Sequence, residues 1–470
     1  MRSSTRTARV GLALCAAGAL SACVDLAPAY RRPDAPVAAA WPVAASASGA
    51  PTTASVAADA SWSEIILDAR LREVVALALA NNRDLRVALL NVDNARAQYR
   101  VQDAARLPAV GLSAGFTRSG TEHAASNSAS LGVGLSAFEI DLFGRLKNSS
   151  DAAFQAYLGT QEGAKTARIT LVAAVADQWL ALAADAQTQR LNERTLELDE
   201  KSLELNTRMH ELGAIKGLPV AQAQAALEAT RGTLAAGRAQ LQQDRNALTL
   251  LAGRELPEDL LPMDAMPADA AALVDVPAGL PSSVLQQRPD VLSAEHSLQA
   301  AQLDIGVARA AFFPSISLTG SAGTASVNLA GLFKGSNGSW SFGPSVSLPL
   351  FDGGARQAQL DSARVQRDIA LANYEKAIQA AFSEVADALA VRASLAERAA
   401  AQRAQVQASE TALRYADALF RHGGSSYLEV LDAQRGLYSA QQSGIALALA
   451  EKQNRIALVK ALGGGWRESK

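Results

Sequence analysis

The sequence predicts a mainly α-helical protein with a membrane β-barrel, built from a duplicated helix–strand–strand–helix unit. Three observations support this fold class. Blocks of residues recur in one order about 210 residues apart. Helical stretches of nearly 70 residues would be roughly 100 Å long, several times the width of a small domain. Two pairs of segments of about ten residues alternate apolar with small polar side chains, which is the length and period of a transmembrane β-strand.

The duplication rests on three matching blocks. Each block keeps several identical residues, and the separation of the two copies is nearly constant. Representative pairs are Asp84 and Asp290, Asp141 and Asp352, and Gly213 and Gly423. Chance does not readily produce three blocks in one order at one separation, so we interpret them as a tandem duplication.

The N-terminus has the pattern of an export signal. Arginines precede a short apolar run, Val10–Leu20, that cannot span a bilayer. The run ends in Leu20-Ser21-Ala22-Cys23, which resembles a bacterial lipobox; the alternative is an ordinary cleavage site that happens to precede a cysteine. We expect residue Cys23 to become the acylated N-terminus and to carry several acyl chains, enough for stable anchoring, with no cofactor besides this covalent lipid.

Composition argues against several other classes of protein. A net charge of −2 without a basic run speaks against a nucleic-acid partner. Cys15 leaves with the signal, so the mature chain can form no internal disulfide. The four histidines are scattered, and no motif of a nucleophile, a zinc hydrolase or a phosphate-binding loop occurs, so no enzymatic activity is predicted.

Periodicity and punctuation divide the chain into segments. Helical patterns run from Trp62 to Leu107, from Gly144 to Leu212, from the following turn to Leu251, from Ser283 to Pro314, and from Gly354 to Leu462 with one turn between. The predicted organisation is a signal peptide (1–22), a lipidated tether (23–62), a first repeat (63–256), a Pro-rich linker (257–281), a second repeat (282–464) and a tail (465–470).

The distal part of the first long helix has a coiled-coil pattern. Spacings of three and four alternate through Leu191, Thr195, Leu198, Ser202, Leu205, Met209 and Leu212. These residues are predicted to form a packing seam. No helical stretch contains 18 uninterrupted apolar residues, so none is predicted to cross a membrane as a single span.

Four strands are predicted near 109–118, 129–140, 315–323 and 340–350, each pair flanking a polar loop. A soluble hairpin packed on the helices is the alternative. If the strands enter a membrane, open sheet edges there would leave backbone groups unpaired at several kcal/mol each. Four strands are too few to close a barrel, so this interpretation requires several chains to share one.

Local motifs then resemble those of the outer-membrane channel lipoproteins of tripartite RND efflux pumps, the OprM/CusC/NodT type in the TolC superfamily. The motifs are Tyr30-Arg31-Arg32-Pro33, the Phe138–Gly144 junction, Gln287-Arg288-Pro289-Asp290-Val291, Ala311-Phe312-Phe313-Pro314, Leu350-Phe351-Asp352-Gly353-Gly354 and the Tyr427–Gln434 segment. The resemblance implies a homotrimer with a 12-stranded β-barrel continuous with a 12-helix periplasmic α-barrel. It further implies lipid anchoring in the outer membrane, a periplasmic adaptor, an inner-membrane RND-type pump and passive conduction of drugs or other small compounds.

The same resemblance implies a gate at the periplasmic tip. Matching the Tyr427–Gln434 segment places Leu428 and Asp432 on the constriction, with Glu429 and Arg435 in the charged network around them. Judged from spacing alone, Glu429, Asp432 and Arg435 are more typical of a solvated helix surface, and the family resemblance is what favours the gate. The predicted tip turns contain Gly213, Gly217, Pro219, Gly423 and Gly424.

The first tip departs from the family pattern, because Pro219 stands where some members carry an acidic residue. No carboxylate is available there to close an interhelix pair, so the lock is expected to rest on the second hairpin. Two other functions remain open at this point. One is a periplasmic adaptor or structural coiled-coil lipoprotein, which would lack the duplicated strand pairs; the other is a protein-secretion channel of the same superfamily. The scarcity of Met and Cys gives no soft-metal relay and weakens a copper-export assignment.

Overall fold

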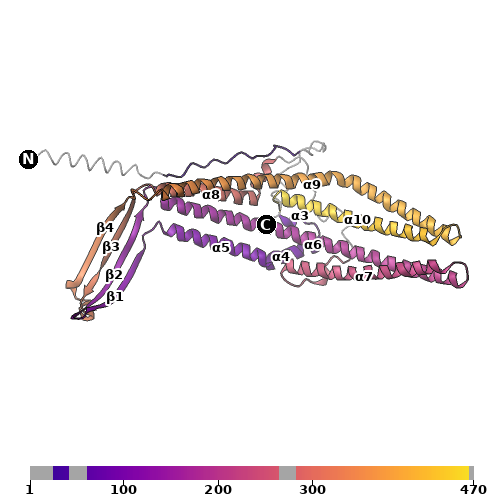
Figure 1. Ribbon diagram of the computed structural model, residues 1–470, viewed down its shortest axis with the longest axis horizontal. Coiled ribbons are helices and arrows are strands. Elements are labelled where there is room, and N and C mark those ends of the chain that lie inside the picture. Colours follow the sequence, from indigo (N-terminus) through magenta and orange to yellow (C-terminus); the bar gives the residue numbers. More distant parts are fainter. Residues whose placement is uncertain (1–24, 42–60, 264–281, 465–470) are drawn as a thin grey trace, which may run out of the picture. The chain divides into compact units, whose positions relative to one another are not determined.

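The computed structural model describes residues 25–41, 61–263 and 282–464. Cys23, the signal, much of the tether and part of the linker therefore lie outside the described residues. The elements run in one order along the chain (Figure 1). The main helices are α3 (Trp62–Ile65), α4 (Ala69–Asn81), α5 (Arg83–Ala104), α6 (Arg145–Glu211), α7 (Gly217–Ala252), α8 (Pro289–Ala310), α9 (Ala355–Arg421) and α10 (Tyr427–Ala461). The strands are β1 (Val110–Thr121), β2 (Ala124–Ile140), β3 (Ser315–Ser326) and β4 (Gly338–Ser347), and short 3-10 turns lie at 258–260, 282–287, 329–331 and 335–337.

The chain forms two compact units, which are described separately. The first comprises Met1–Ala35, Leu90–Glu162 and Leu292–Lys376. It contains the sheet, the parts of the helices next to the strands, and the N-terminal segment from Asp25. The second comprises Pro36–Leu89, Gly163–Val291 and Ala377–Lys470, and it contains the two long helical hairpins.

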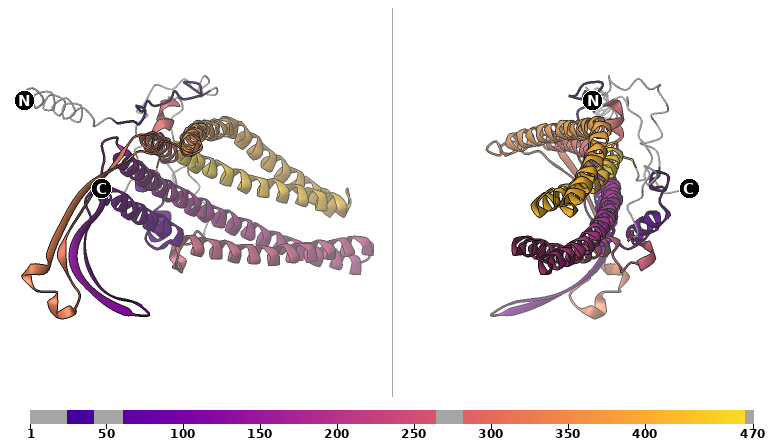
Figure 2. Two further views of the ribbon diagram at one scale, coloured as in Figure 1. Left: turned by 60° about the vertical axis from the view of Figure 1, so that its left-hand side comes forward. Right: turned by 90° about the vertical axis from the view of Figure 1, so that its right-hand side faces the viewer.

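One antiparallel sheet in the order β1-β2-β3-β4 joins the two copies of the repeat (strands labelled in Figure 1; two further views in Figure 2). The join is the β2–β3 pair, where Gly132 lies opposite Gly323. A Cβ atom at Gly323 would lie 2.5 Å from the carbonyl oxygen of Leu131, so the two backbones approach more closely than a side chain allows. A β-bulge lies between Leu135 and Phe138, at Ala137 with a φ of 44°.

The first hairpin is longer than its sequence suggests. A polar loop was expected between about 118 and 129, but β1 and β2 continue through it and leave only a two-residue turn between Thr121 and Ala124. The polar residues pair across the strands, as Ser119 and Ser126 do at 3.2 Å between their hydroxyl oxygens. Small polar residues here are therefore sheet residues, and polarity alone was a poor guide to a loop.

The helical pattern before the first hairpin is one continuous stretch in the sequence and three helices in the structure. Asp68 begins α4 by accepting hydrogen bonds from the backbone amides of Arg70 and Leu71. Asn82 separates α4 from α5, since its side chain accepts from the Leu85 amide and donates to the Leu251 carbonyl. These short polar side chains compete with the helical backbone for its hydrogen bonds, which ends one helix and starts the next.

Helix α6 is 67 residues long and contains the one window among the described helices that is apolar enough, by length and composition, to cross a membrane. In that window 67% of the residues are buried inside the protein. Burial of this kind is typical of a core helix.

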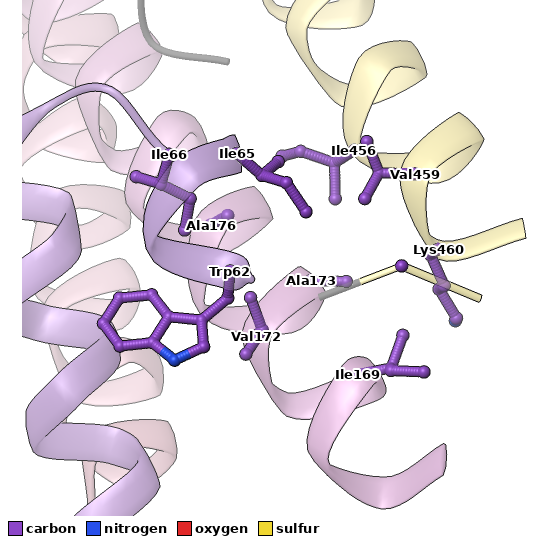
Figure 3. A pocket seen from close by; sticks show the side chains of 11 residues that line it. Trp62, Ile65, Ile66, Ile169, Val172, Ala173, Ala176, Ile456, Val459 and Lys460 are labelled. Atoms are coloured by element: carbon purple, nitrogen blue, oxygen red, sulfur yellow. The ribbon is translucent and has the colours of Figure 1, made fainter. Parts of the chain in front are cut away.

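In the second unit α3 and α6 enclose an apolar recess with α10 (Figure 3). Trp62, Ile169 and Ile456 each contribute from a different helix. Next to this apolar surface, burial raises the pKa of Asp177 to about 6, opposed by the attraction of Lys460. The Asp177 Oδ1 atom has no hydrogen-bond partner among the described residues, which leaves a carboxyl group with little to compensate its lost hydration.

Candidate functional site

The two long hairpins end in identical backbone turns (Figure 1). At the end of α6 the amide of Gly213 bonds to the His210 carbonyl, and the next amide bonds to the Met209 carbonyl at 2.8 Å. At the end of α9 the amides of Gly423 and Gly424 make the same two bonds to the carbonyls of Phe420 and Leu419. Both first glycines are left-handed, with φ of 76° and 74°, which makes each turn a Schellman motif.

Two of the expected tip residues lie elsewhere. Helix α7 begins at Gly217, so Gly217 and Pro219 belong to its first turn rather than to the loop. Proline is compatible with that position, because the first amides of a helix have no intrahelical acceptor. The second hairpin differs, since Gly423 and Gly424 do lie in its turn and α10 begins only at Tyr427.

Glu429 caps the start of α10. Ser426 and Glu429 form a capping box, in which the Ser426 amide donates to the Glu429 Oε1 at 3.4 Å. This interaction satisfies a backbone amide that would otherwise lack a partner, and it places a carboxylate at the positive end of the helix. In this structure Glu429, which was predicted as a gate residue, acts as a helix-capping residue at the tip.

An aromatic cluster fixes the direction in which α10 leaves the turn. Phe420 and Tyr427 are buried, with ring centroids 5.5 Å apart. Val430 and Leu431 pack on the same cluster, together with Ala223 of α7. One face of the first turns of α10 is therefore committed to packing, and the opposite face is free to point elsewhere.

Three of the predicted gate residues lie together on an exposed side of α10, next to the packed face. Leu428 is 49% exposed, and Asp432 and Arg435 are exposed as well. Their spacings of four and three residues place them on one side of α10. That these exposed side chains form a constriction stays a prediction of the family resemblance.

Arg435 also faces a polar recess lined by α6, α7 and α10. Its nearest acidic neighbour there is Asp199 of α6, a buried side chain that accepts a 2.6 Å hydrogen bond from the Thr230 hydroxyl. Burial raises the pKa of Asp199, and the Thr230 hydrogen bond and the positive charge of Arg435 oppose that shift. The charged network predicted around Arg435 thus extends across helices, to a residue that the sequence did not single out.

Two hydrogen bonds connect α6 directly to α10. The hydroxyls of Ser202 and Tyr427 lie 2.7 Å apart, and Tyr438 donates to the Asn192 Oδ1 at 2.7 Å. These contacts tie the first hairpin to the second. On α6, Asn192, Asp199 and Asn206 are spaced seven residues apart and form a polar seam. This spacing could have identified the seam from the sequence if polar residues had been counted together with apolar ones.

Three leucines of the predicted apolar seam are not buried within the single chain. Leu198, Leu205 and Leu212 are exposed by 49%, 38% and 84% in the chain. The buried positions of the same helix are Asn192, Asp199 and Asn206. The heptad pattern was real, but its leucines and its polar residues occupy different faces, and tertiary partners determine which face is buried.

Comparison with known proteins decides the family. The family model described as Outer membrane efflux protein matches residues 74–254 and 280–464. The chain belongs to the outer membrane efflux protein family. It is 42% identical over 453 residues to the probable efflux pump outer membrane protein TtgC of Pseudomonas putida, covering 94% of this chain and 93% of that protein. It is 40% identical over 458 residues to the cation efflux system protein CusC of Escherichia coli K12, with 97% and 99% covered.

The fold is shared with solved members of the family. The open state of the MtrE outer membrane channel of Neisseria gonorrhoeae superposes with a TM-score of 0.83 at 36% identity, covering 94% of this chain and 99% of that one. The outer-membrane efflux role and location expected from the sequence are therefore confirmed. The adaptor and secretion-channel alternatives are not favoured.

Proposed function

We propose that this protein is the passive exit channel of a tripartite efflux system, formed by three copies of the chain. The three copies would share a β-barrel in the outer membrane, and their long helices would form a conduit through the periplasm. A periplasmic adaptor and an inner-membrane RND-type pump would deliver the cargo and supply energy and direction. The family match over both repeats supports this proposal.

The observation that carries the proposal is the open sheet. Its edge strands β1 and β4 are 12 and 10 residues long, have no further strand beside them in the described chain, and are exposed throughout. Leu112, Phe116, Trp340 and Phe342 are all more than half exposed on these strands. An edge of this kind in lipid must be paired, and three copies of a 4-stranded sheet would supply 12 strands for a closed barrel.

The gate would lie at the tip of the second hairpin. Threefold symmetry would bring three copies of Leu428 and of Asp432 towards one axis. Three carboxylates at close range repel one another unless cations offset them, and Arg435 lies on the same helix face. Glu429 would hold the start of α10 rigid through its capping box, and the Schellman turns at Gly213 and Gly423 would reverse the chain at the tips.

The cargo class stays broad in this proposal. CusC, named above, is described for cations, and two further relatives from Pseudomonas putida are described for toluene and for antibiotics. A conduit lined by small polar residues selects little by itself, so cargo identity would be set mainly by the pump. Residues 1–22 would direct export, and Cys23 would carry the lipid. The proposed organisation of the mature chain is a tether (23–62), a first repeat (63–256), a linker (257–281), a second repeat (282–464) and a tail (465–470).

Single-channel recording tests the channel. The purified protein is placed in planar bilayers, and its mass in detergent is measured in parallel. We expect a trimer with small currents that are closed most of the time. A monomer without conductance would remove both the barrel and the exit-channel function.

The gate has its own test in the substitution Asp432→Ala. If Arg435 side chains offset the carboxylates, loss of the carboxylates removes that attraction across the tip. The tip should then loosen and the time-averaged conductance rise about tenfold, which corresponds to roughly 1.4 kcal/mol in the closed–open equilibrium. Glu410→Ala is the matched control, because Glu410 is an exposed carboxylate on α9 away from the tip. Equal conductance of Asp432→Ala and the unsubstituted channel would exclude Asp432 from the gate.

A further inference from the structure

The first described residues of the proposed tether are docked on a helix. Residues 25–32, called the strap below, lie along α8 in the first unit and touch it at regular intervals. The contacted positions are Arg309, Gly306, Gln302, Gln299 and Glu295, which follow one another at three- and four-residue spacing along one helix face. The strap therefore runs antiparallel to α8 in a defined register.

A carboxylate clamp holds the far end of the strap. Arg32 donates two hydrogen bonds to Glu295, at 2.8 Å and 2.5 Å, and the Tyr30 hydroxyl donates a third at 2.8 Å. Glu295 is 5% exposed, and its burial would raise the pKa of its carboxyl. The hydrogen bonds from Arg32 and Tyr30 outweigh burial and hold that pKa below its ordinary value. A buried carboxylate is tolerated here because the strap neutralises it.

The middle of the strap is held by backbone contacts. Gln302 donates to the carbonyls of Pro28 and Ala29, and Arg309 donates to the carbonyl of Leu26, each at 3.0 Å. A Cβ at Gly306 would lie 2.9 Å from the Cα of Ala27. The strap therefore approaches the backbone of α8 most closely at this glycine, where α8 has no side chain. Contacts to backbone atoms fix position and depend little on the side chains of the strap.

The near end of the strap lies beside the junction of strand and helix. Asp25 accepts hydrogen bonds from Lys147 at 2.9 Å and from Asn148 at 3.0 Å, both in the first turn of α6. Its Cα is 3.7 Å from where a Cβ of Gly144 would be, and Gly144 follows the end of β2 by four residues. Asp25 is two residues after Cys23, so their Cα atoms are at most roughly 7 Å apart.

We propose that the strap is a positioning device for membrane insertion: by clamping on Glu295 it holds the acylated Cys23 at the level where the strands enter the membrane. The Tyr30-Arg31-Arg32-Pro33 motif, which the gate and conduit leave unexplained, supplies two of the three groups of the clamp. The proposal rests on the acylation of Cys23 and on the membrane role of the strands, as proposed above.

The physical reason is effective concentration. The lipid anchor and the strands are two membrane-binding parts of one chain, and the second binds more readily when the linker holds it at the membrane surface. Beyond the strap the chain is held again at Trp41, which is buried and stacks on Phe382 with ring centroids 5.6 Å apart. If the strap were undocked, about 18 residues between Trp41 and Cys23 would spread the anchor over roughly 20–25 Å. A docked strap reduces that spread to the reach of two residues, so the acyl chains and the strand ends meet the same membrane surface together.

The first measurement is backbone hydrogen exchange of residues 25–32 in the full-length acylated protein. Glu295→Gln and Arg32→Ala should each increase exchange of the strap at least tenfold, and Tyr30→Phe, which removes one hydrogen bond, should increase it less. Arg31→Ala is the matched control and should leave exchange unchanged, because Arg31 is exposed and adjacent to the clamp without taking part in it. Unchanged exchange in Glu295→Gln and Arg32→Ala would overturn the clamp.

The second measurement is insertion in cells, as the fraction of chain that resists urea extraction from the outer membrane as an oligomer. Glu295→Gln should lower this fraction at least threefold in the acylated chain. It should have no effect in a chain exported with an ordinary signal and carrying Cys23→Ser, because there is then no anchor to position. An equal loss in both backgrounds, or a loosened strap with unchanged insertion, would overturn the positioning role.

Mass spectrometry of the N-terminal peptide separates this inference from the function on which it rests. An unmodified Cys23 in the unsubstituted protein would remove the anchor and with it the positioning role. Acylation together with a missing conductance would contradict the exit channel, whereas the strap would still be judged by its exchange and by insertion.

Discussion

The two hairpin tips have the same backbone and different chemistry. Both close with a Schellman turn, and at a separation of about 210 residues their positions correspond one to one. Where the second tip has Ser426, Tyr427 and Glu429, the first has Lys216, Gly217 and Pro219.

The difference decides how each helix starts after the turn. The start of α10 has a capping box and a buried aromatic ring, whereas Lys216 makes no side-chain capping bond to the described part of α7. Phe420 packs on Tyr427, whereas in the first copy His210 lies beside Gly217, which has no side chain, and its Nδ1 hydrogen-bonds with the Ile215 carbonyl at 3.0 Å. Duplication thus kept the turn, which depends on one glycine, while the capping box and the buried tyrosine ring occur in the second copy and not at the corresponding positions of the first.

The largest test of this comparison is the removal of the aromatic ring. Tyr427→Ala leaves a cavity in the cluster with Phe420 and breaks the bond to Ser202, so the free energy of unfolding of the second hairpin should fall by about 3–4 kcal/mol. Gly217→Ala at the corresponding position should change the first hairpin by less than about 1 kcal/mol, in the stabilising direction, because a Cβ there is 3.9 Å from the nearest ring atom. Amide exchange of α7 and α10 in each variant measures both, and equal responses would show that the two tips are held alike.

A second test compares two carboxyls of α6, the buried Asp199 and the half-buried Asp177. Asp199 has a hydrogen bond from Thr230 and the charge of Arg435 nearby, whereas burial raises the pKa of Asp177 to about 6 against the attraction of Lys460 alone. Because that folded-state pKa lies above the unfolded value of 3.8, the folded protein binds the proton more tightly, and stability falls as pH rises from about 4 to above 6.

Asp177→Asn should remove this loss. At pH 7.5 the variant should be more stable than the unsubstituted protein by about 1–2 kcal/mol, a value reduced from the full shift because the side chain is partly solvated. At pH 4 the two proteins should unfold at nearly the same urea concentration. Parallel pH curves from pH 4 to 7.5 would show that Asp177 is not the titrating group.

The smallest test transfers the cap from one tip to the other. Lys216→Ser combined with Pro219→Glu gives the first tip the Ser-x-x-Glu pattern of the second, and it should stabilise the start of α7 by about 1 kcal/mol or less. Ser426→Ala in the second tip should cost a similar amount. The readout is amide exchange in the first turn of each helix, and a loss in both variants would mean that the first turn of α7 needs its proline.

Sequence reasoning worked where local chemistry determines structure. Gly213 and Gly423 marked the turns because a left-handed residue favours glycine, and Leu428 and Asp432 could be placed on one face of α10 from their spacing. The strands were found from alternation, although β1 and β2 extend through residues that their polarity assigned to a loop.

The misses share one cause, which is that tertiary partners decide between local alternatives. The heptad of Leu198 and Leu205 predicted a seam, yet Tyr438 and Thr230 provide hydrogen bonds that let Asn192 and Asp199 take the buried positions instead. The clamp on Glu295 lies more than 260 residues from Arg32 in the chain, and no local pattern connects them.

The polar seam of α6 has a thermodynamic consequence. Asn192, Asp199 and Asn206 are buried, and separating α6 from its neighbours there would exchange protein hydrogen bonds for bonds to water. Exposure of polar surface lowers the heat capacity and exposure of apolar surface raises it, so separation along this seam would carry a small heat-capacity change. The free energy of such a separation would vary nearly linearly with temperature. A given change in temperature would therefore change that free energy by the same amount in the cold and in the warm.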